Sequence, residues 1–177
     1  MGRKLRFTTN LYVRELQYYS DKFDVEETGA RFGFERTLLG NDYLRGSVNF
    51  TFEETGLVDV ASNASTELKN EAGTDLISQI GVGIAYDTRG GGDLPTRGQR
   101  TSFDLNVAPD VLGSEREFYG VHLKSAWYFR GLGEEHVIEL HGQAAVVDSL
   151  QNGQTIPYLY RHALGGMRNL RGFNYHE

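Results

Sequence analysis

Residues 157–173 read PYLYRHALGGMRNLRGF, and the interpretation of the whole chain starts from this stretch. A tyrosine-rich segment precedes the pair Gly165-Gly166, and the stretch ends in Arg171-Gly172-Phe173. Neither the 3.6-residue period of a helix nor the two-residue period of a strand runs through it. The polar, glycine-punctuated pattern therefore predicts a structured loop.

Upstream of this loop, seven segments alternate apolar and polar residues with the period of a β-strand. The third segment is the clearest, because Val48, Phe50 and Phe52 alternate with polar or charged residues. Asn, Ser, Thr and Glu fill residues 57–75, which predicts a long loop with a helical turn near 65–69. The seven segments span approximately residues 5–18, 25–36, 44–53, 76–86, 101–108, 117–130 and 136–147.

Each predicted strand has one apolar and one polar face, and we expect the polar face to line a water-filled interior. In the fourth strand Ile80, Val82 and Ile84 form the apolar face, whereas Gly81 and Gly83 leave the other face nearly bare. The segments suit the roughly 9 to 11 residues that cross a bilayer at a tilt. Because lipid cannot satisfy an open sheet edge, such strands must close into a barrel. The sequence therefore predicts an all-β, antiparallel transmembrane β-barrel segment with a consistently polar inner face.

Composition agrees with a β-rich chain. The sequence holds 10 Tyr, 10 Phe and 22 Gly but only 3 Pro, a mixture that favours strands and tight turns. The absence of Cys excludes a disulfide scaffold and thiolate chemistry, and the net charge of -6 argues against a nucleic-acid partner. No apolar run is long enough for a transmembrane helix.

We expect one domain over residues 1–177, with strands in 5–150 and the loop in 151–177. The first residues carry charges and then enter a strand pattern at once, without the apolar core of a signal peptide. We therefore expect the chain to be a fragment of a longer protein.

The loop also carries a pattern that resembles a known family. A tyrosine and an arginine lead into Gly-Gly, and Arg-Gly-Phe follows a few residues later. This pattern resembles the BamA-like outer-membrane protein-insertase family, within the bacterial surface-antigen and two-partner secretion superfamily. The matching residues are Tyr160, Arg161, Gly165, Gly166, Leu170, Arg171, Gly172 and Phe173.

A second match lies between the fourth and fifth predicted strands. Family barrels carry an aspartate at a strand end, followed by a Pro-Thr-x-Gly-x-Arg turn. From the residues alone, Pro95 fixes φ, Gly98 supplies a turn conformation, and Arg100 can pair with Asp87 across the hairpin. An ordinary hairpin explains this turn better than a functional site does. The matching residues are Asp87, Pro95, Thr96, Gly98 and Arg100.

The resemblance implies a sixteen-stranded barrel, to which this chain contributes the fifth to eleventh strands and most of the sixth outer loop. The remaining strands and the periplasmic POTRA domains then lie outside the chain. The resemblance also implies that Arg171 turns into the lumen to pair with a carboxylate on a later strand, with Phe173 beside it and Gly172 close to the wall. From the tripeptide alone, a solvent-exposed loop arginine is the simpler interpretation.

We find no catalytic or metal-binding constellation, and we expect a protein that is not an enzyme and needs no cofactor or metal. His136 and His141 are separated by an odd number of strand positions, so they point to opposite faces. His122 is expected to line the lumen as a solvated side chain. The members of adjacent acidic pairs such as Glu53-Glu54 also point apart in a strand, so none resembles a tuned acid and base.

The expected function is that of the barrel portion of an assembly factor that folds and inserts β-barrel proteins into the bacterial outer membrane. The partners that the resemblance implies are outer-membrane lipid, unfolded outer-membrane proteins and, in the intact protein, accessory assembly lipoproteins. Three alternatives stay open: a two-partner secretion or TamA-like translocation barrel, a plain porin-like barrel, and a soluble β-sandwich binding domain.

Overall fold

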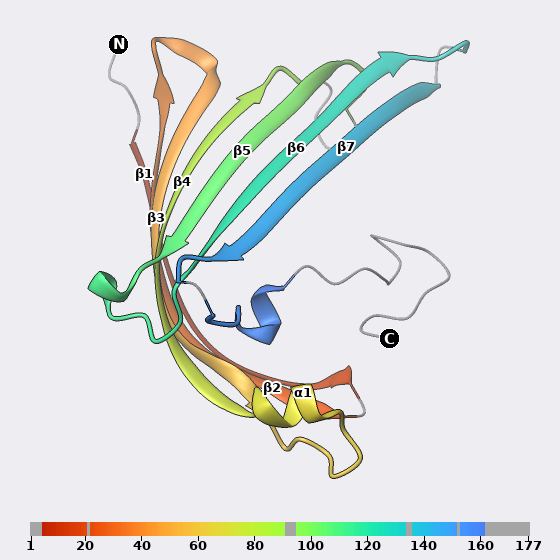
Figure 1. The fold of residues 1–177 in the computed structure, drawn as a ribbon. Helices are drawn as coiled ribbons and strands as arrows, with labels where there is room; N and C mark the ends of the chain where they lie inside the picture. Colours follow the sequence, from red (N-terminus) through yellow and green to blue (C-terminus); the bar gives the residue numbers. More distant parts are fainter. Residues whose placement is uncertain (1–4, 21, 91–94, 134–135, 152, 162–177) are drawn as a thin grey trace.

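The computed structural model describes residues 5–20, 22–90, 95–133, 136–151 and 153–161, and for residues 18–20 only the backbone. Seven strands of this part form a single antiparallel sheet in which each strand pairs with its neighbours in the chain. The prediction of an all-β antiparallel sheet of seven strands is confirmed (Figure 1). The strands are β1 (Leu5–Ser20), β2 (Phe23–Leu38), β3 (Asn41–Val58), β4 (Gly73–Asp87), β5 (Gly98–Ala108), β6 (Phe118–Arg130) and β7 (Val137–Ser149).

The two ends of the sheet have different connections. At one end, called here the turn end, β2 joins β3 through Leu39 and Gly40. Their φ angles of 52° and 70° are both left-handed, which is typical of a tight type I′ hairpin turn. The opposite end, called the loop end, carries the three short helices α1 (Thr66–Asn70), η1 (Asp110–Leu112) and η2 (Tyr158–Tyr160). None of the helices in the described ranges is both long and apolar enough to cross a membrane.

The β3–β4 connection contains the expected helical turn. Ser65 caps α1, and its hydroxyl oxygen accepts a hydrogen bond from the backbone N–H of Leu68 at 3.3 Å. The connection is shorter than the predicted 57–75, because β3 continues to Val58 and β4 begins at Gly73. Leu57 is 2% exposed and packs in the protein interior, a tertiary contact that local sequence does not reveal.

Apolar side chains occupy the outer face of the sheet and remain uncovered. Leu11 is 73% exposed and Val13 is 82% exposed. No second sheet lies over this face in the described part of the chain, whereas a soluble sandwich buries one apolar face against another. The alternation therefore has the sense expected of a membrane barrel. One row in register across the sheet consists of Phe7, Phe34, Val48, Val82, Leu105, Val121 and Val146.

The inner face alternates glycines with polar side chains across the strands. Gly81 leaves the inner face of its own strand bare, as predicted, and amide side chains of the neighbouring strands lean over it. A Cβ atom at position 81 would lie 2.4 Å from Asn106 Oδ1 and 2.5 Å from Asn49 Nδ2. One inner row in register consists of Thr8, Gly33, Asn49, Gly81, Asn106, Gly120 and Val147.

The inner face is not polar throughout, so the prediction of a consistently polar inner face is wrong. Near the loop end, two clusters of buried apolar residues stand on this face because a returning segment of chain covers them. The segment contributes Tyr158 and Leu159 to the first cluster and Ile156 and Tyr160 to the second. The buried residues are Phe23, Val25 and Leu57 in the first cluster, and Ile77, Ala108 and Phe118 in the second.

Gly81→Ala is expected to destabilise the sheet by about 1–3 kcal/mol, because the added methyl group displaces two amide side chains. Gly142→Ala is the matched control: it lies in a strand, and a Cβ there meets nothing within 4 Å. Urea unfolding of the protein refolded in detergent measures both changes. Equal stability of the two variants would contradict the close contact at Gly81.

Candidate functional site

The chain that follows β7 returns along the inner, concave side of the sheet (Figure 1). We call residues 153–161 the inner loop. Pro157 is buried, and the Tyr158 ring meets Phe23 edge-on with centroids 5.6 Å apart. The Tyr160 ring packs on Phe118 at 4.6 Å. The tyrosine-rich segment that precedes the Gly-Gly pair therefore anchors the loop to the sheet.

A carboxylate on β3 joins the inner loop to the sheet. The hydroxyl of Tyr12, on β1, donates to one oxygen of Glu53, and the hydroxyl of Tyr160 donates to the other. Glu53 is only 8% exposed. Hydrogen bonds from two phenols offset the desolvation of this buried carboxylate, so the arrangement is stable only when all three side chains are present. We call Tyr12, Glu53 and Tyr160 the Glu53 clamp.

A glycine on the intervening strand makes the clamp possible. Tyr12 pairs with Gly29, and Gly29 pairs with Glu53, so the tyrosine reaches its partner two strands away. A Cβ at position 29 would lie 2.6 Å from Glu53 Cβ and 2.7 Å from the carbonyl oxygen of Phe52. Any side chain there would block the approach.

The Tyr160 phenol acts as a permanent donor. Burial raises its pKa far above the ordinary tyrosine value, and the nearby Glu53 carboxylate raises the pKa further. The phenol is therefore protonated and can donate at neutral pH. Its oxygen also accepts from Gln79 Nε2 at 3.4 Å.

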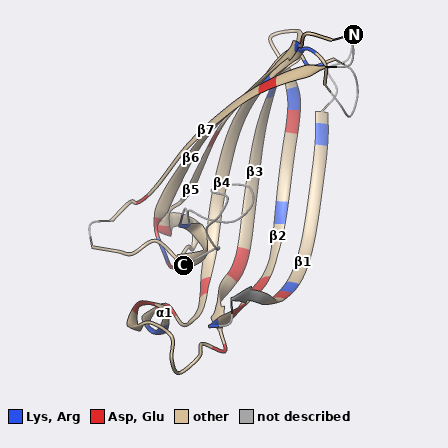
Figure 2. Ribbon diagram, turned by 90° about the vertical axis from the view of Figure 1, so that its right-hand side faces the viewer, with Lys and Arg blue, Asp and Glu red and all other residues tan. Residues whose placement is uncertain are grey.

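The next residue connects the inner loop to the β3–β4 connection. Arg161 bonds to Glu71 through Nη2 at 2.8 Å, contacts Glu67 through Nη1, and donates from Nε to the carbonyl oxygen of Ile156 at 2.8 Å. The Glu71 side chain is 9% exposed. Acidic residues gather at this end of the sheet and around α1, so the arginine meets complementary charge (Figure 2). Arg161 and the Glu53 clamp thus fix two successive residues of the loop.

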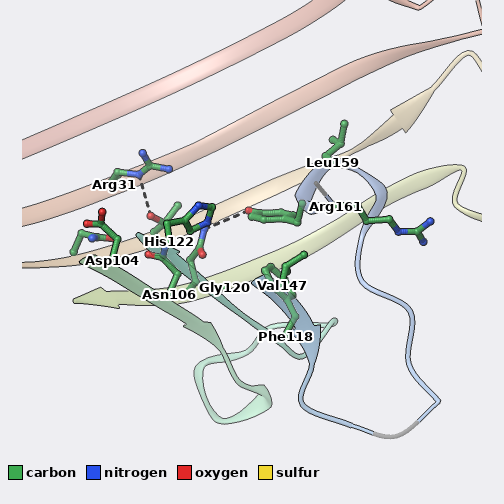
Figure 3. Close-up of a pocket in the computed structure, with 13 residues that line it drawn as sticks. Arg31, Asp104, Asn106, Phe118, Gly120, His122, Val147, Leu159 and Arg161 are labelled. Atoms are coloured by element: carbon green, nitrogen blue, oxygen red, sulfur yellow. Dashed lines mark hydrogen bonds between the residues drawn. The ribbon is translucent and has the colours of Figure 1, made fainter. Parts of the chain in front are cut away.

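A polar hollow of about 530 Å³ lies beneath the inner loop. It is lined by Leu159 and Arg161 from the loop and by Arg31, Asp104 and His122 from the strands, and in Figure 3 the Arg161 side chain extends away from those strand residues. Arg31 donates from Nε to Thr51 Oγ1 at 3.0 Å. The placement of His122 agrees with the expectation that it faces the lumen.

The family model of the Omp85 superfamily domain matches residues 1–177. The chain belongs to the Omp85 superfamily. A solved structure with a similar fold is BamA from Haemophilus ducreyi lacking POTRA domains 1-3, with a TM-score of 0.75 at 18% sequence identity. The match covers 97% of this chain and 35% of that one, so this chain spans about a third of its length. No curated protein matches the chain.

These comparisons confirm the predicted resemblance to a BamA-like barrel. An Omp85 chain with this topology presents its apolar rows outward and its inner loop toward the lumen. The Glu53 clamp lies on the lumen side of this Omp85 sheet.

The turn motif lies at the turn end, between β4 and β5. Arg100 Nη1 is 3.5 Å from Asp87 Oδ2, which is the contact expected from the sequence. Arg89 binds Asp87 more closely, at 2.9 Å and 2.8 Å, and this hydrogen bond raises the pKa of the Arg89 guanidinium. Gly98 has φ of 97°, and a Cβ there would lie 2.4 Å from the carbonyl oxygen of Thr88. These contacts explain a well-formed hairpin.

Two other residues of the turn motif serve the hairpin in simpler ways. The backbone N–H of Thr96 donates to the carbonyl oxygen of Gly90 at 3.2 Å, and Pro95 precedes it in the turn. The loop motif lies outside the described residues, so its role stays a prediction. Its residues are Gly165, Gly166, Arg171, Gly172 and Phe173.

Sequence reasoning missed Glu53. The adjacent Glu53-Glu54 pair does diverge as expected, but the two carboxylates have different environments. Glu54 is exposed and accepts from Thr74 Oγ1 at 2.9 Å, whereas Glu53 is buried in the clamp. Polar inward positions opposite glycine are the only sequence signal for this site, and reading it requires the strand register.

Glu53→Gln is expected to release the inner loop, because it removes the charge that strengthens two hydrogen bonds. Chymotrypsin cleavage at Tyr158 and Tyr160 should become about 10- to 100-fold faster, since cleavage follows local opening. Glu54→Gln, one residue away on the outer face, should leave the rate unchanged. Cleavage at the wild-type rate in Glu53→Gln would show that the clamp does not hold the loop.

Arg161→Gln removes a cation that joins two carboxylates, one of them nearly buried. We expect the inner loop to lose about 1–2 kcal/mol of local stability, measured by the same chymotrypsin assay. Arg45→Gln is the control, because Arg45 is 53% exposed and 3.5 Å from Glu35 at the turn end, a pair that contributes at most about 1 kcal/mol. A larger effect at Arg45 than at Arg161 would refute the connection through α1.

Proposed function

We propose that this chain forms part of the wall and the base of the inner loop in an outer-membrane barrel that folds and inserts β-barrel proteins. Membership of the Omp85 superfamily and the fold shared with the BamA structure support this proposal. The single structural observation behind it is the inner loop, which the Glu53 clamp holds against the lumen side of the sheet.

The apolar outer face of the sheet supports a location in a membrane. In water, an apolar surface crossing seven strands would associate with other molecules. In a bilayer the same rows meet lipid chains, while polar side chains meet water inside. We therefore place the protein in the bacterial outer membrane, with outer-membrane lipid as a partner.

The proposed mechanism is strand addition and involves no enzymatic step. In the intact barrel a seam between strands opens sideways, and an incoming strand of an unfolded outer-membrane protein pairs with the exposed edge. The strands described here contribute a rigid wall, and the inner loop braces it from within. Accessory assembly lipoproteins would act on the intact protein.

The test uses the intact gene product reconstituted in liposomes with an unfolded outer-membrane β-barrel protein as client. We expect faster appearance of folded, protease-resistant client in the bilayer than with empty liposomes. Delivery of the client into the liposome lumen, without insertion, would instead indicate a secretion or translocation barrel. Conductance without any effect on the client would indicate a porin.

Arg171→Ala in that protein is expected to impair barrel assembly or the stability of the protein itself, because the resemblance places this guanidinium on a lumen carboxylate. Outer-membrane protein levels in cells that depend on the variant measure the effect. Arg45→Ala, at an exposed ion pair of the turn end, is the control. Normal levels in the Arg171 variant would contradict the bracing role of the loop motif.

A further inference from the structure

A second hollow, of about 250 Å³, lies at the turn end, away from the inner loop. It is formed by β5, β6 and β7, where small residues leave a low floor between longer side chains. In one row Ala126 lies between Arg100 and His141, and in the next row Lys124 lies between Ser102 and Gln143. All six residues line the hollow. The floor is thus surrounded by hydrogen-bond donors.

The positive charges around this hollow are only partly balanced. Arg89, Arg100 and Lys124 line it, and Asp87 contacts the two arginines. Arg89 occupies both oxygens of Asp87, at 2.9 Å from Oδ1 and 2.8 Å from Oδ2, whereas Arg100 lies at 3.5 Å. The side chain of Lys124 makes no hydrogen bond or ion pair with any residue that the structure describes. Donor capacity therefore remains on Arg100 and Lys124.

Apart from Asp87, no carboxylate within the described ranges forms an ion pair with Arg89, Arg100 or Lys124. Glu139 accepts a hydrogen bond from the Tyr128 hydroxyl at 3.1 Å. Asp104 lies one row further along the sheet, paired in register with His122, and forms no ion pair within the described ranges. The side chain of Arg100 is 51% exposed to the lumen side. The hollow thus offers a guanidinium and an ammonium to whatever enters it.

We propose that this hollow is a binding site for an oxyanion, that is, a carboxylate or a phosphate presented inside the lumen. A guanidinium binds such groups through paired N–H donors, and a lysine adds a compact charge. Lipid headgroups outside the barrel are separated from the site by the sheet, whose outer face here carries Phe103, Leu123 and Leu140. The ligand therefore comes from the lumen, either as an acidic polypeptide segment or as a free anion.

The binding experiment uses the folded protein in detergent micelles and does not depend on insertase activity. The probes are a fluorescent glutamate-rich peptide, the same peptide with glutamine in place of glutamate, and inorganic phosphate. We expect fluorescence anisotropy to show binding of the glutamate peptide but not of the glutamine peptide. Phosphate should displace the bound glutamate peptide. Binding of phosphate without the peptide would identify a small soluble anion as the ligand and still support the site.

Two variants and a matched control locate the binding. Lys124→Gln loses no side-chain hydrogen bond or ion pair within the described structure, so it should fold normally and weaken binding about tenfold. Arg100→Gln should act similarly. Arg45→Gln is the control, since Arg45 stands on the inner face at the same end, is 53% exposed, and has a carboxylate partner, Glu35, at 3.5 Å.

The outcomes separate a site from general attraction. Loss of binding in both hollow variants, with wild-type binding in Arg45→Gln, supports the proposal. No binding of either anion to the wild-type protein overturns it. An equal loss in Arg45→Gln also overturns it, because the attraction would then come from the overall charge of the inner face.

Discussion

One buried carboxylate determines where the inner loop goes. Glu53 would be unstable in its position without partners, because an ionised group that is 8% exposed must be hydrogen-bonded. One of its two phenols comes from the first strand of the sheet and the other from the segment after the last strand. Strands β1 and β3 and the inner loop are thereby joined at a single point. The packing of Tyr160 on Phe118 keeps its hydroxyl aimed at that point.

The inner face shows how a curved sheet accommodates polar side chains. On the concave side of a barrel, side chains converge, so bulky residues need small neighbours. Gly33, Gly81 and Gly120 alternate in register with Asn49 and Asn106, and each amide leans into space that a glycine leaves. Gly29 does the same for the clamp. The glycines therefore provide the space that neighbouring polar side chains of the inner face occupy.

The sequence predicts the parts of this structure that depend on local pattern. A two-residue period is a local property, so the seven strands and their faces could be predicted correctly. Strand ends were less accurate at the loop end, where Leu57 is held by contacts from the inner loop. The hairpin at Gly98 could be predicted because the residue types themselves fix its backbone.

Glu53 could not be predicted, because its environment is a property of register. Its two partners are 41 and 107 residues away in the chain. From the sequence alone, a carboxylate in a strand is interpreted as a solvated charge that faces the lumen. Its burial becomes evident only when the facing glycine and the two phenols are known to converge on it. Arg161 illustrates the same limit: the motif marked the residue, but its carboxylate partners lie in α1 and the residue that follows it.

Two kinds of contact hold the inner loop: hydrophobic packing, which has no preferred direction, and hydrogen bonds and ion pairs, which do. Tyr158 and Leu159 pack into one apolar cluster, whereas Ile156 and Tyr160 pack into the other. Apolar contact alone would tolerate a slip of the segment along the sheet, since hydrophobic burial depends mainly on area. A slip of one residue would bring the charge of Arg161 against Phe118 and remove it from Glu71. The polar contacts therefore select one register, and the apolar clusters make that register stable.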